Sequence, residues 1–247
     1  MSNLRVEVRP GIIQVNLDER RYYEVDGEYL PSITTILDVY PKGHGFRKWL
    51  VSQFSQEEAD AVLHEAGDRG SRVHWGVEEL LSGNDVTYDS VPYGFNSSFT
   101  PKEWKYLIAF MNWFEDNKPV VQSIEETVVG DGWAGTADLI ATIEGKLCLI
   151  DWKTSGAIYE SHKCQVAAYA TATGIEQARI VRLGSKHKVG YEQFTLDAVL
   201  IEEYYKLFLH VKAVWSHENP DPHPRFLEVP EKLNLLDIFK GENDANS

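Results

Sequence analysis

The spacing of hydrophobic positions differs between the two halves of the chain. Residues 12–30 alternate as short strands do, and Asp26-Gly27 within them is typical of a hairpin turn. The apolar stripe of residues 56–81 returns every three to four positions, which predicts a long amphipathic helix. Thr100 and Pro101 are start signals for a second helix over 101–117. The turn-rich stretch 83–100 between the helices is expected to form a loop.

Two shorter segments precede the long helix. Pro31 and Ser32 are helix-start signals, so residues 31–37 are expected to form a helical segment. Residues 41–55 combine glycines with basic and aromatic side chains, and we expect a loop there. Such a loop can contact a nucleic-acid strand by stacking and phosphate contact, and a surface loop with a few packed aromatic rings is an equal alternative.

Beyond residue 118 the pattern changes to short strands separated by turns. The expected elements are strands at 119–129, 134–143 and 146–152, a helix at about 157–173, strands at about 177–183 and 189–195, and a helix from Asp197 to about Trp215.

These elements predict an α/β fold in one compact unit. Residues 119–215 would form a mixed central sheet flanked by helices, preceded by an N-terminal helical region that, with the first strands, occupies residues 1–118. Residues 216–247 contain four prolines and a polar end, and we expect an irregular tail there.

Composition adds a constraint on partners. The formal net charge is −14, whereas nucleic-acid binders usually carry a basic face. A site that holds divalent cations must itself be acidic, so the charge leaves room for metal-dependent chemistry on DNA. The N-terminus has no apolar signal-peptide core, and no apolar run approaches the length of a membrane span, so we expect a cytoplasmic protein.

The strongest chemical signal lies at the end of the third strand of the second half. Asp151 and Lys153 are two residues apart and so point to the same side of a strand. A hairpin at Glu144-Gly145 would bring Asp138 alongside them. Two carboxylates and a lysine are the groups that phosphodiester cleavage with Mg²⁺ or Mn²⁺ requires, and a plain surface ion pair of Asp151 and Lys153 is the alternative.

Further motifs extend this signal. Residues 135–138 read Gly-Thr-Ala-Asp, residues 151–155 read Asp-Trp-Lys-Thr-Ser, and Gln165 and Tyr169 share one face of the following helix. Gly70 and His74 stand four residues apart on the long upstream helix. Together these motifs resemble the PD-(D/E)XK nuclease superfamily and, within it, the RecB-type exonucleases.

Two longer stretches sharpen this likeness. Residues 31–37, beginning Pro-Ser-Ile-Thr, and residues 145–155 resemble the mitochondrial genome maintenance exonuclease and its bacterial and phage relatives. No mitochondrial targeting sequence is recognisable here, which favours a phage or bacterial enzyme.

The resemblance implies a DNA exonuclease that prefers single strands and acts in replication, recombination or repair. Its metal ligands would be His74, Asp138, Asp151 and the backbone carbonyl of Trp152, with Lys153 catalytic. Family members often carry a glutamate on the preceding strand. Glu125 is the candidate here, and its neighbour Glu126 is an open competitor.

Four residues are candidates for contact with DNA: Thr154, Ser155, Gln165 and Tyr169. The hydroxyls of Thr154 and Ser155 can donate hydrogen bonds to a phosphate, or they can cap the next helix. The basic turn around His187, from Gly184 to Gly190, has the character of a solvated hairpin rather than a binding patch.

Several alternatives remain open. A site-specific or structure-specific endonuclease of the same superfamily, a non-catalytic DNA binder and an acidic DNA mimic each fit part of the pattern. The two cysteines cannot form a four-cysteine set, so no iron–sulfur cluster is expected. Residues 233–239 could dock on a replication or recombination protein, or fold back on the chain itself.

Overall fold

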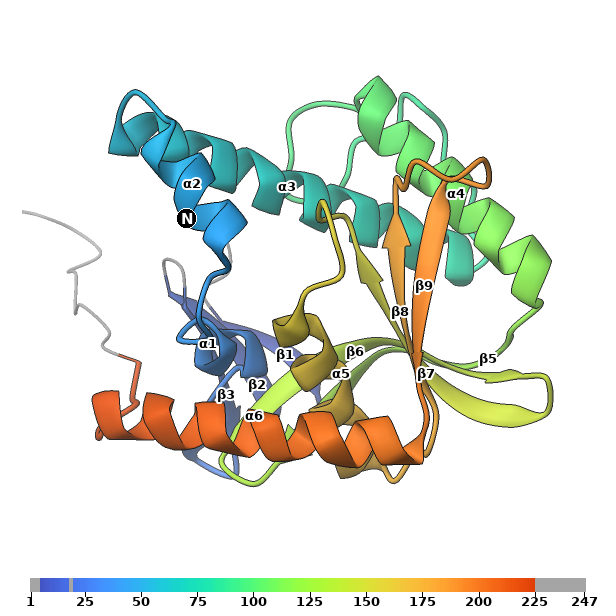
Figure 1. Cartoon of the computed structure of the whole chain (residues 1–247). Helices are drawn as coiled ribbons and strands as arrows, with labels where there is room; N and C mark the ends of the chain where they lie inside the picture. Colours follow the sequence, from blue (N-terminus) through green and yellow to red (C-terminus); the bar gives the residue numbers. More distant parts are fainter. Residues whose placement is uncertain (1–4, 18–19, 225–247) are drawn as a thin grey trace, which may run out of the picture.

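The N-terminal part of the chain is a β-sheet. The computed structural model describes residues 5–17 and 20–224, and Figure 1 shows their arrangement. Four antiparallel strands pair in sequence order: β1 (Arg5–Arg9), β2 (Ile12–Leu17), β3 (Arg20–Val25) and β4 (Glu28–Pro31). The predicted hairpin turn is confirmed, because Asp26 and Gly27 join β3 to β4 with φ angles of 51° and 82°.

The strands predicted within residues 12–30 are confirmed, whereas the description of the N-terminal part as a helical region is wrong, because a four-stranded sheet occupies residues 5–31. Their alternating pattern buries the directly paired Val15 and Tyr22 on one side of the sheet, which a helix would not do. Helices begin only with α1 (Ile33–Leu37). Its N-cap is Ser32, whose side chain accepts a hydrogen bond from the Thr35 backbone N–H, as the start signal predicts.

The second sheet carries the main core. Its strands lie in the order β5 (Val120–Gly130), β6 (Trp133–Ile143), β7 (Lys146–Lys153), β8 (Ala178–Leu183) and β9 (Tyr191–Leu196). All neighbours are antiparallel except β7 and β8, which are joined by α5 (Glu160–Thr173). The predicted order of strands and helices beyond residue 118 is confirmed, with boundaries within about three residues.

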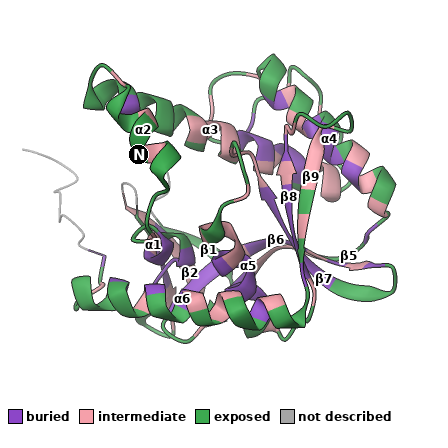
Figure 2. Cartoon of the chain, in the orientation of Figure 1, coloured by how far each residue is buried: buried purple, intermediate pink, exposed green. Residues whose placement is uncertain are grey.

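Helices cover both faces of this sheet. Val73 and Val77 of α3 (Gln56–Leu81) and Phe110 of α4 (Pro101–Asn117) pack on one face, in a cluster with Leu139 and Trp152. On the other face, α1, α5 and α6 (Ala198–Glu218) pack in a second cluster. Figure 2 shows the buried residues concentrated on the central strands and the helix faces turned toward them.

Residues 41–55 differ from the prediction. Instead of a loop, the structure has the helix α2 (His44–Val51), none of whose residues is buried. The glycines that favour a loop in the sequence lie at the helix start, where Gly43 is the N-cap. Within this helix the rings of Phe46 and Trp49 are in contact at i and i+3, with centroids 5.5 Å apart and planes tilted by 43°.

The two sheets are in contact. Tyr23 of β3 hydrogen-bonds Thr136 of β6 at 3.0 Å, and Arg9 of β1 donates to the carbonyl of Thr127 on β5 at 3.0 Å. Among the described residues, no helix is long and apolar enough to cross a bilayer.

Candidate metal centre

Two carboxylates face each other across neighbouring strands. Ile124 and Glu126 of β5 pair with Leu139 and Ala137 of β6, so Glu125 occupies the position opposite Asp138. Like charges directly opposite each other destabilise a sheet. A cation between the two carboxylates would remove that penalty.

The backbone at Glu125 is strained. Its φ is 50°, in the left-handed region that residues other than glycine rarely adopt. Non-glycine residues in such conformations occur preferentially at functional sites. Glu126 is engaged elsewhere, because it pairs with Arg9 at 2.8 Å and accepts a hydrogen bond from Ser123 at 2.5 Å. Of the two candidates, the structure therefore brings Glu125 to Asp138.

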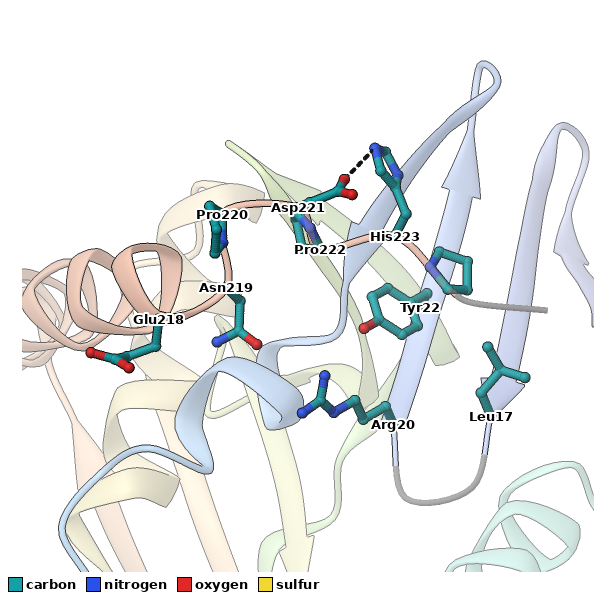
Figure 3. Close-up of a pocket in the computed structure, with 10 residues that line it drawn as sticks. Leu17, Arg20, Tyr22, Glu218, Asn219, Pro220, Asp221, Pro222 and His223 are labelled. Carbon is teal, nitrogen blue, oxygen red and sulfur yellow. Dashed lines mark ion pairs between the residues drawn. The ribbon is translucent and has the colours of Figure 1, made fainter. Parts of the chain in front are cut away.

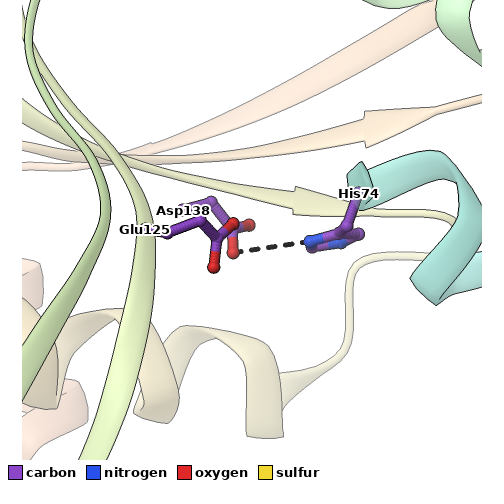
Figure 4. A group of neighbouring side chains, drawn as sticks. All are labelled: His74, Glu125 and Asp138. Atoms are coloured by element: carbon purple, nitrogen blue, oxygen red, sulfur yellow. Dashed lines mark ion pairs between the residues drawn. The ribbon is translucent and has the colours of Figure 1, made fainter. Parts of the chain in front are cut away.

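The third member of the group comes from α3. His74 Nδ1 lies 3.5 Å from Asp138 Oδ1, and His74 Nε2 lies 3.1 Å from the carbonyl oxygen of Trp152. One potential ligand atom from each of His74, Glu125 and Asp138 lies within 4.8 Å of the other two. Figure 4 shows His74 approaching the two carboxylates from the opposite side.

Packing accounts for the position of this histidine. Val73 and Val77 on α3 are buried against the sheet, so the neighbouring His74 lies at the border of the core. On β7, the backbone N–H of Trp152 donates to Asp138 Oδ2 at 2.7 Å. These contacts tie α3, β6 and β7 together at one point.

The charges in this group are strongly coupled. Burial disfavours protonated His74, but the Asp138 carboxylate outweighs it and raises the pKa of His74 to about 9. Burial also opposes the charged form of Asp138, yet His74 holds the pKa of Asp138 below its ordinary value. Burial, reinforced by the charge of Asp138, raises the pKa of Glu125 to about 8.

These residues fit a divalent cation. Carboxylate oxygens, a backbone carbonyl and one imidazole form a donor set for Mg²⁺, Mn²⁺ or a similar ion. A bound ion would take the place of the proton that Glu125 otherwise holds near neutral pH. The group therefore has the composition of a metal site, with the identity of the ion left open by these ligands.

Asp151 and Lys153 form a separate pair beside this group. Lys153 Nζ lies 2.7 Å from Asp151 Oδ2, without the alignment of a hydrogen bond, and Asp151 is only 1% exposed. Burial raises the pKa of Asp151 to about 6 despite the charge of Lys153. In place of the plain surface ion pair, the structure has a buried Asp151 in contact with a half-buried Lys153, and Asp151 lies outside the group of three.

A relay of side chains holds Lys153 from α5. Lys153 Nζ donates to Gln165 Oε1 at 3.0 Å, and Gln165 Nε2 donates to the hydroxyl of Tyr169 at 3.3 Å. Tyr169 is 2% exposed, and its ring packs on Trp133. A direct contact of Tyr169 with DNA would require its ring to leave this position, so the described structure places it as a support for Gln165.

The position of Tyr169 also explains why residue 135 is a glycine. A Cβ atom at this position would lie 2.4 Å from the Tyr169 hydroxyl oxygen, closer than any real contact. The glycine of the Gly-Thr-Ala-Asp motif is therefore needed so that α5 can approach β6.

Thr154 and Ser155 lie in the loop between β7 and α5. Ser155 Oγ donates to the Ala157 carbonyl at 2.7 Å, which shapes the loop, and neither residue caps the next helix. The N-cap of α5 is Tyr159, and its backbone N–H donates to His162 Nδ1 at 3.2 Å. Thr154 lies next to the α3 glycine, since a Cβ on Gly70 would be 3.5 Å from Thr154 Oγ1.

His162 is a neighbour of the site that sequence reasoning missed. Burial and the charge of Lys153 lower its pKa to about 3, so its ring is neutral near pH 7. Its place at the third position of α5 carries no sequence signal, because a single histidine in a helix start is not distinctive. Only the packing of α5 against the end of β7 brings it near Lys153.

A large cavity lies elsewhere. It has a volume of about 500 Å³ and is lined by β2 and β3 residues and by residues 218–224, from the last residue of α6 onward (Figure 3). None of the residues of the metal centre lines it. Residues 233–239, considered above as a docking segment, lie outside the described residues.

No protein-family model matches the chain, and no curated protein matches it. Among solved structures, an alkaline exonuclease (LHK-Exo) from Laribacter hongkongensis is similar over 76% of this chain and 91% of its own, with 11% identity and a TM-score of 0.35. The same enzyme in complex with dAMP gives 12% identity over the same shares and a TM-score of 0.34.

A protein named SSO0001 is similar over 52% of this chain and 68% of its own, with 16% identity and a TM-score of 0.27. Likeness at this level carries no argument about chemistry.

Proposed function

We propose that this protein is a Mg²⁺- or Mn²⁺-dependent deoxyribonuclease that removes nucleotides from DNA ends. One observation carries the proposal: His74, Glu125 and Asp138 form a compact ligand group beside the half-buried Lys153. The ligand group and the lysine come from α3, β5, β6 and β7, elements that only the folded chain brings together.

Four groups would bind the metal ion. The side chains of His74, Glu125 and Asp138 and the carbonyl of Trp152 would hold the ion, with Asp151 as a further proposed ligand. A bound divalent ion supplies a Lewis acid for the scissile phosphate and lowers the pKa of a bound water.

Lys153 would orient the attacking water and offset the negative charge that develops on the phosphate. Asp151 and Gln165 fix its ammonium group within hydrogen-bonding range. Because both partners are themselves buried, little reorganisation is needed when substrate binds.

Action on ends and on single strands is the finer part of the proposal. It is supported by the motif set that includes His74, Gln165 and Tyr169, which resembles the RecB-type exonucleases. Thr154 and Ser155 lie in the loop that leaves the site and would contact the phosphates of the strand. Internal cleavage by an endonuclease is the alternative that the experiment must separate.

The test uses end-labelled linear and circular DNA, single- and double-stranded, with Mg²⁺, Mn²⁺ or chelator. We expect release of nucleotides from linear strands only, and none in chelator. Cleavage of circles at the rate of linear strands would show an endonuclease instead.

The matched variants lie on one strand. Lys153→Ala should lower the hydrolysis rate by at least about a hundredfold, because it removes a charge that acts in the transition state. Lys146→Ala, at the exposed opposite end of β7, should retain the wild-type rate. Equal activity of Lys153→Ala and wild type would refute the site.

A further inference from the structure

A group of positively charged side chains lies near the end of the central sheet at which Lys153 stands. In the parallel pairing of β7 and β8, Lys153 stands next to Arg182. The hairpin between β8 and β9 starts at Gly184, two residues beyond Arg182. By strand geometry, the Cα atom of Gly184 is about 8 Å from the Cα atom of Lys153.

This hairpin and α4 enclose a cleft of about 390 Å³. Lys102 and Lys105 line it from the helix, and Lys188 lines it from the hairpin. Figure 1 shows the hairpin beyond β8 lying against α4. From the sequence, residues 184–190 are expected to form a solvated turn. The sequence does not reveal that the lysines of α4 stand opposite this turn.

Contacts between the hairpin and α4 hold the two walls of the cleft in place. Gly184 has φ of 77° and lies under the ring of Tyr106, and Gly190 approaches Ala109, where a Cβ would be 3.0 Å from the Ala109 Cβ. Asn112 on α4 donates to the carbonyl of Val189 at 2.9 Å. Both ends of the hairpin are therefore fixed on α4, and the lysine-bearing walls keep their spacing.

The charges of the cleft are uncompensated. None of its three lysines forms an ion pair within the described part of the chain, although acidic residues outnumber basic ones 38 to 24. The nearby Glu103 does not neutralise them, because it is buried and pairs with Arg72 at 2.9 Å. Other lysines of this protein do pair with carboxylates, as Lys206 does with Glu202.

We propose that the cleft of Lys102, Lys105 and Lys188 binds the phosphodiester backbone of the DNA strand whose end lies at the metal centre. This inference rests on the proposed function and adds a second contact site to it. Several lysines around a cleft suit consecutive phosphates, since each ammonium is a point charge with rotatable donors. The arrangement supplies the local basic surface that the acidic chain otherwise lacks.

The test measures binding rather than cleavage. A fluorescently labelled single-stranded oligonucleotide is titrated in chelator over a series of salt concentrations. Lys105→Gln/Lys188→Gln is compared with Lys146→Gln/Lys206→Gln, which removes the same charge from exposed positions that do not line the cleft.

For the cleft variant we expect Kd at low salt to rise about tenfold. The plot of the logarithm of the association constant against the logarithm of the salt concentration should become less steep by about 1.4, or about 0.7 for each lost phosphate contact. The control variant should keep the wild-type slope. Equal slopes and affinities for the two variants, with unchanged circular dichroism, would overturn the inference. Binding is measured in chelator and so does not depend on cleavage. A wild-type protein without nuclease activity would refute the proposed function, whereas the binding of DNA in the cleft is decided by the comparison of the two variants alone.

Discussion

At the scale of single residues, Glu125 shows how the site depends on backbone geometry. Alternation along β5 does not decide between the candidate Glu125 and its competitor Glu126, because the sequence does not say which of them faces the site. The left-handed backbone at Glu125 and the ion pair of Glu126 with Arg9 decide between them. A strained carboxylate opposite another carboxylate is expected where function, rather than stability, sets the geometry.

The prediction for this residue compares two neighbouring substitutions. Glu125→Gln should weaken Mn²⁺ binding by roughly tenfold or more, because it removes a charged ligand. It should not destabilise the metal-free protein near pH 7, since Glu125, with a pKa of about 8, is already neutral there and Gln is a neutral side chain of the same shape. Isothermal titration calorimetry and urea unfolding in chelator measure the two effects.

Glu126→Gln is the control and should leave the calorimetric isotherm unchanged. Asp138→Asn should weaken metal binding as well. An unaltered isotherm for either Glu125→Gln or Asp138→Asn would remove that residue from the ligand set.

At the scale of elements, the contact between β6 and α5 joins the two motifs of the core. Tyr169 lies over Gly135 and supports Gln165, which in turn holds Lys153. The sequence pattern contains all four residues, but it does not show that the glycine and the tyrosine touch. Their roles are those of packing and positioning, which a list of motif residues does not distinguish from substrate contact.

Gly135→Ala tests this contact. The added methyl would overlap the Tyr169 hydroxyl, so we expect a loss of about 1–3 kcal/mol in the free energy of unfolding, measured with urea. Tyr169→Phe removes the nearest of the overlapping atoms, so Gly135→Ala should cost less in its presence.

Gly67→Ala is the matched control. It lies on α3, where a Cβ meets nothing within 4 Å, and it should stabilise the protein slightly through helix propensity. Additive effects of Gly135→Ala and Tyr169→Phe would mean that the two residues do not interact.

At the scale of the whole molecule, metal, charge and pH are linked. The folded, metal-free protein holds protons on His74 up to a pKa of about 9 and on Glu125 up to about 8, well above their ordinary values of 6.5 and 4.5. The folded state therefore binds more protons than the unfolded state across neutral pH. Stability from these groups is present below their unfolded pKa values and is lost as pH rises through the folded ones.

Thermal unfolding should show this linkage. In chelator, the contribution of these groups to Tm should decrease from about pH 6 to about pH 9. Saturating Mn²⁺ should raise Tm by about 5 °C or more at the higher pH, and by less at about pH 6, where protons compete for the same ligands.

The double variant Glu125→Gln/Asp138→Asn is the control for this measurement. It should show neither the metal-induced shift nor its pH dependence. A shift of equal size at both pH values would contradict protons and metal sharing these ligands.

The sequence by itself determined the order of the elements beyond residue 118 and the placing of Asp138 on the strand beside that of Asp151 and Lys153. Both depend on local information: strand period, turn residues and the two-residue alternation of side chains. The helix starts at Ser32 and Thr100 could be read in the same way, because caps are local hydrogen bonds.

Only the tertiary structure decided the rest. The choice of Glu125, the burial of Asp151 and the three lysines around one cleft each depend on residues far apart in the chain. Local patterns do not encode such distances, because they result from how helices pack on the sheet and where the chain is allowed to bend. For the same reason, local patterns predict the strands within residues 12–30 but neither the four-stranded sheet that they form nor the helix at His44–Val51.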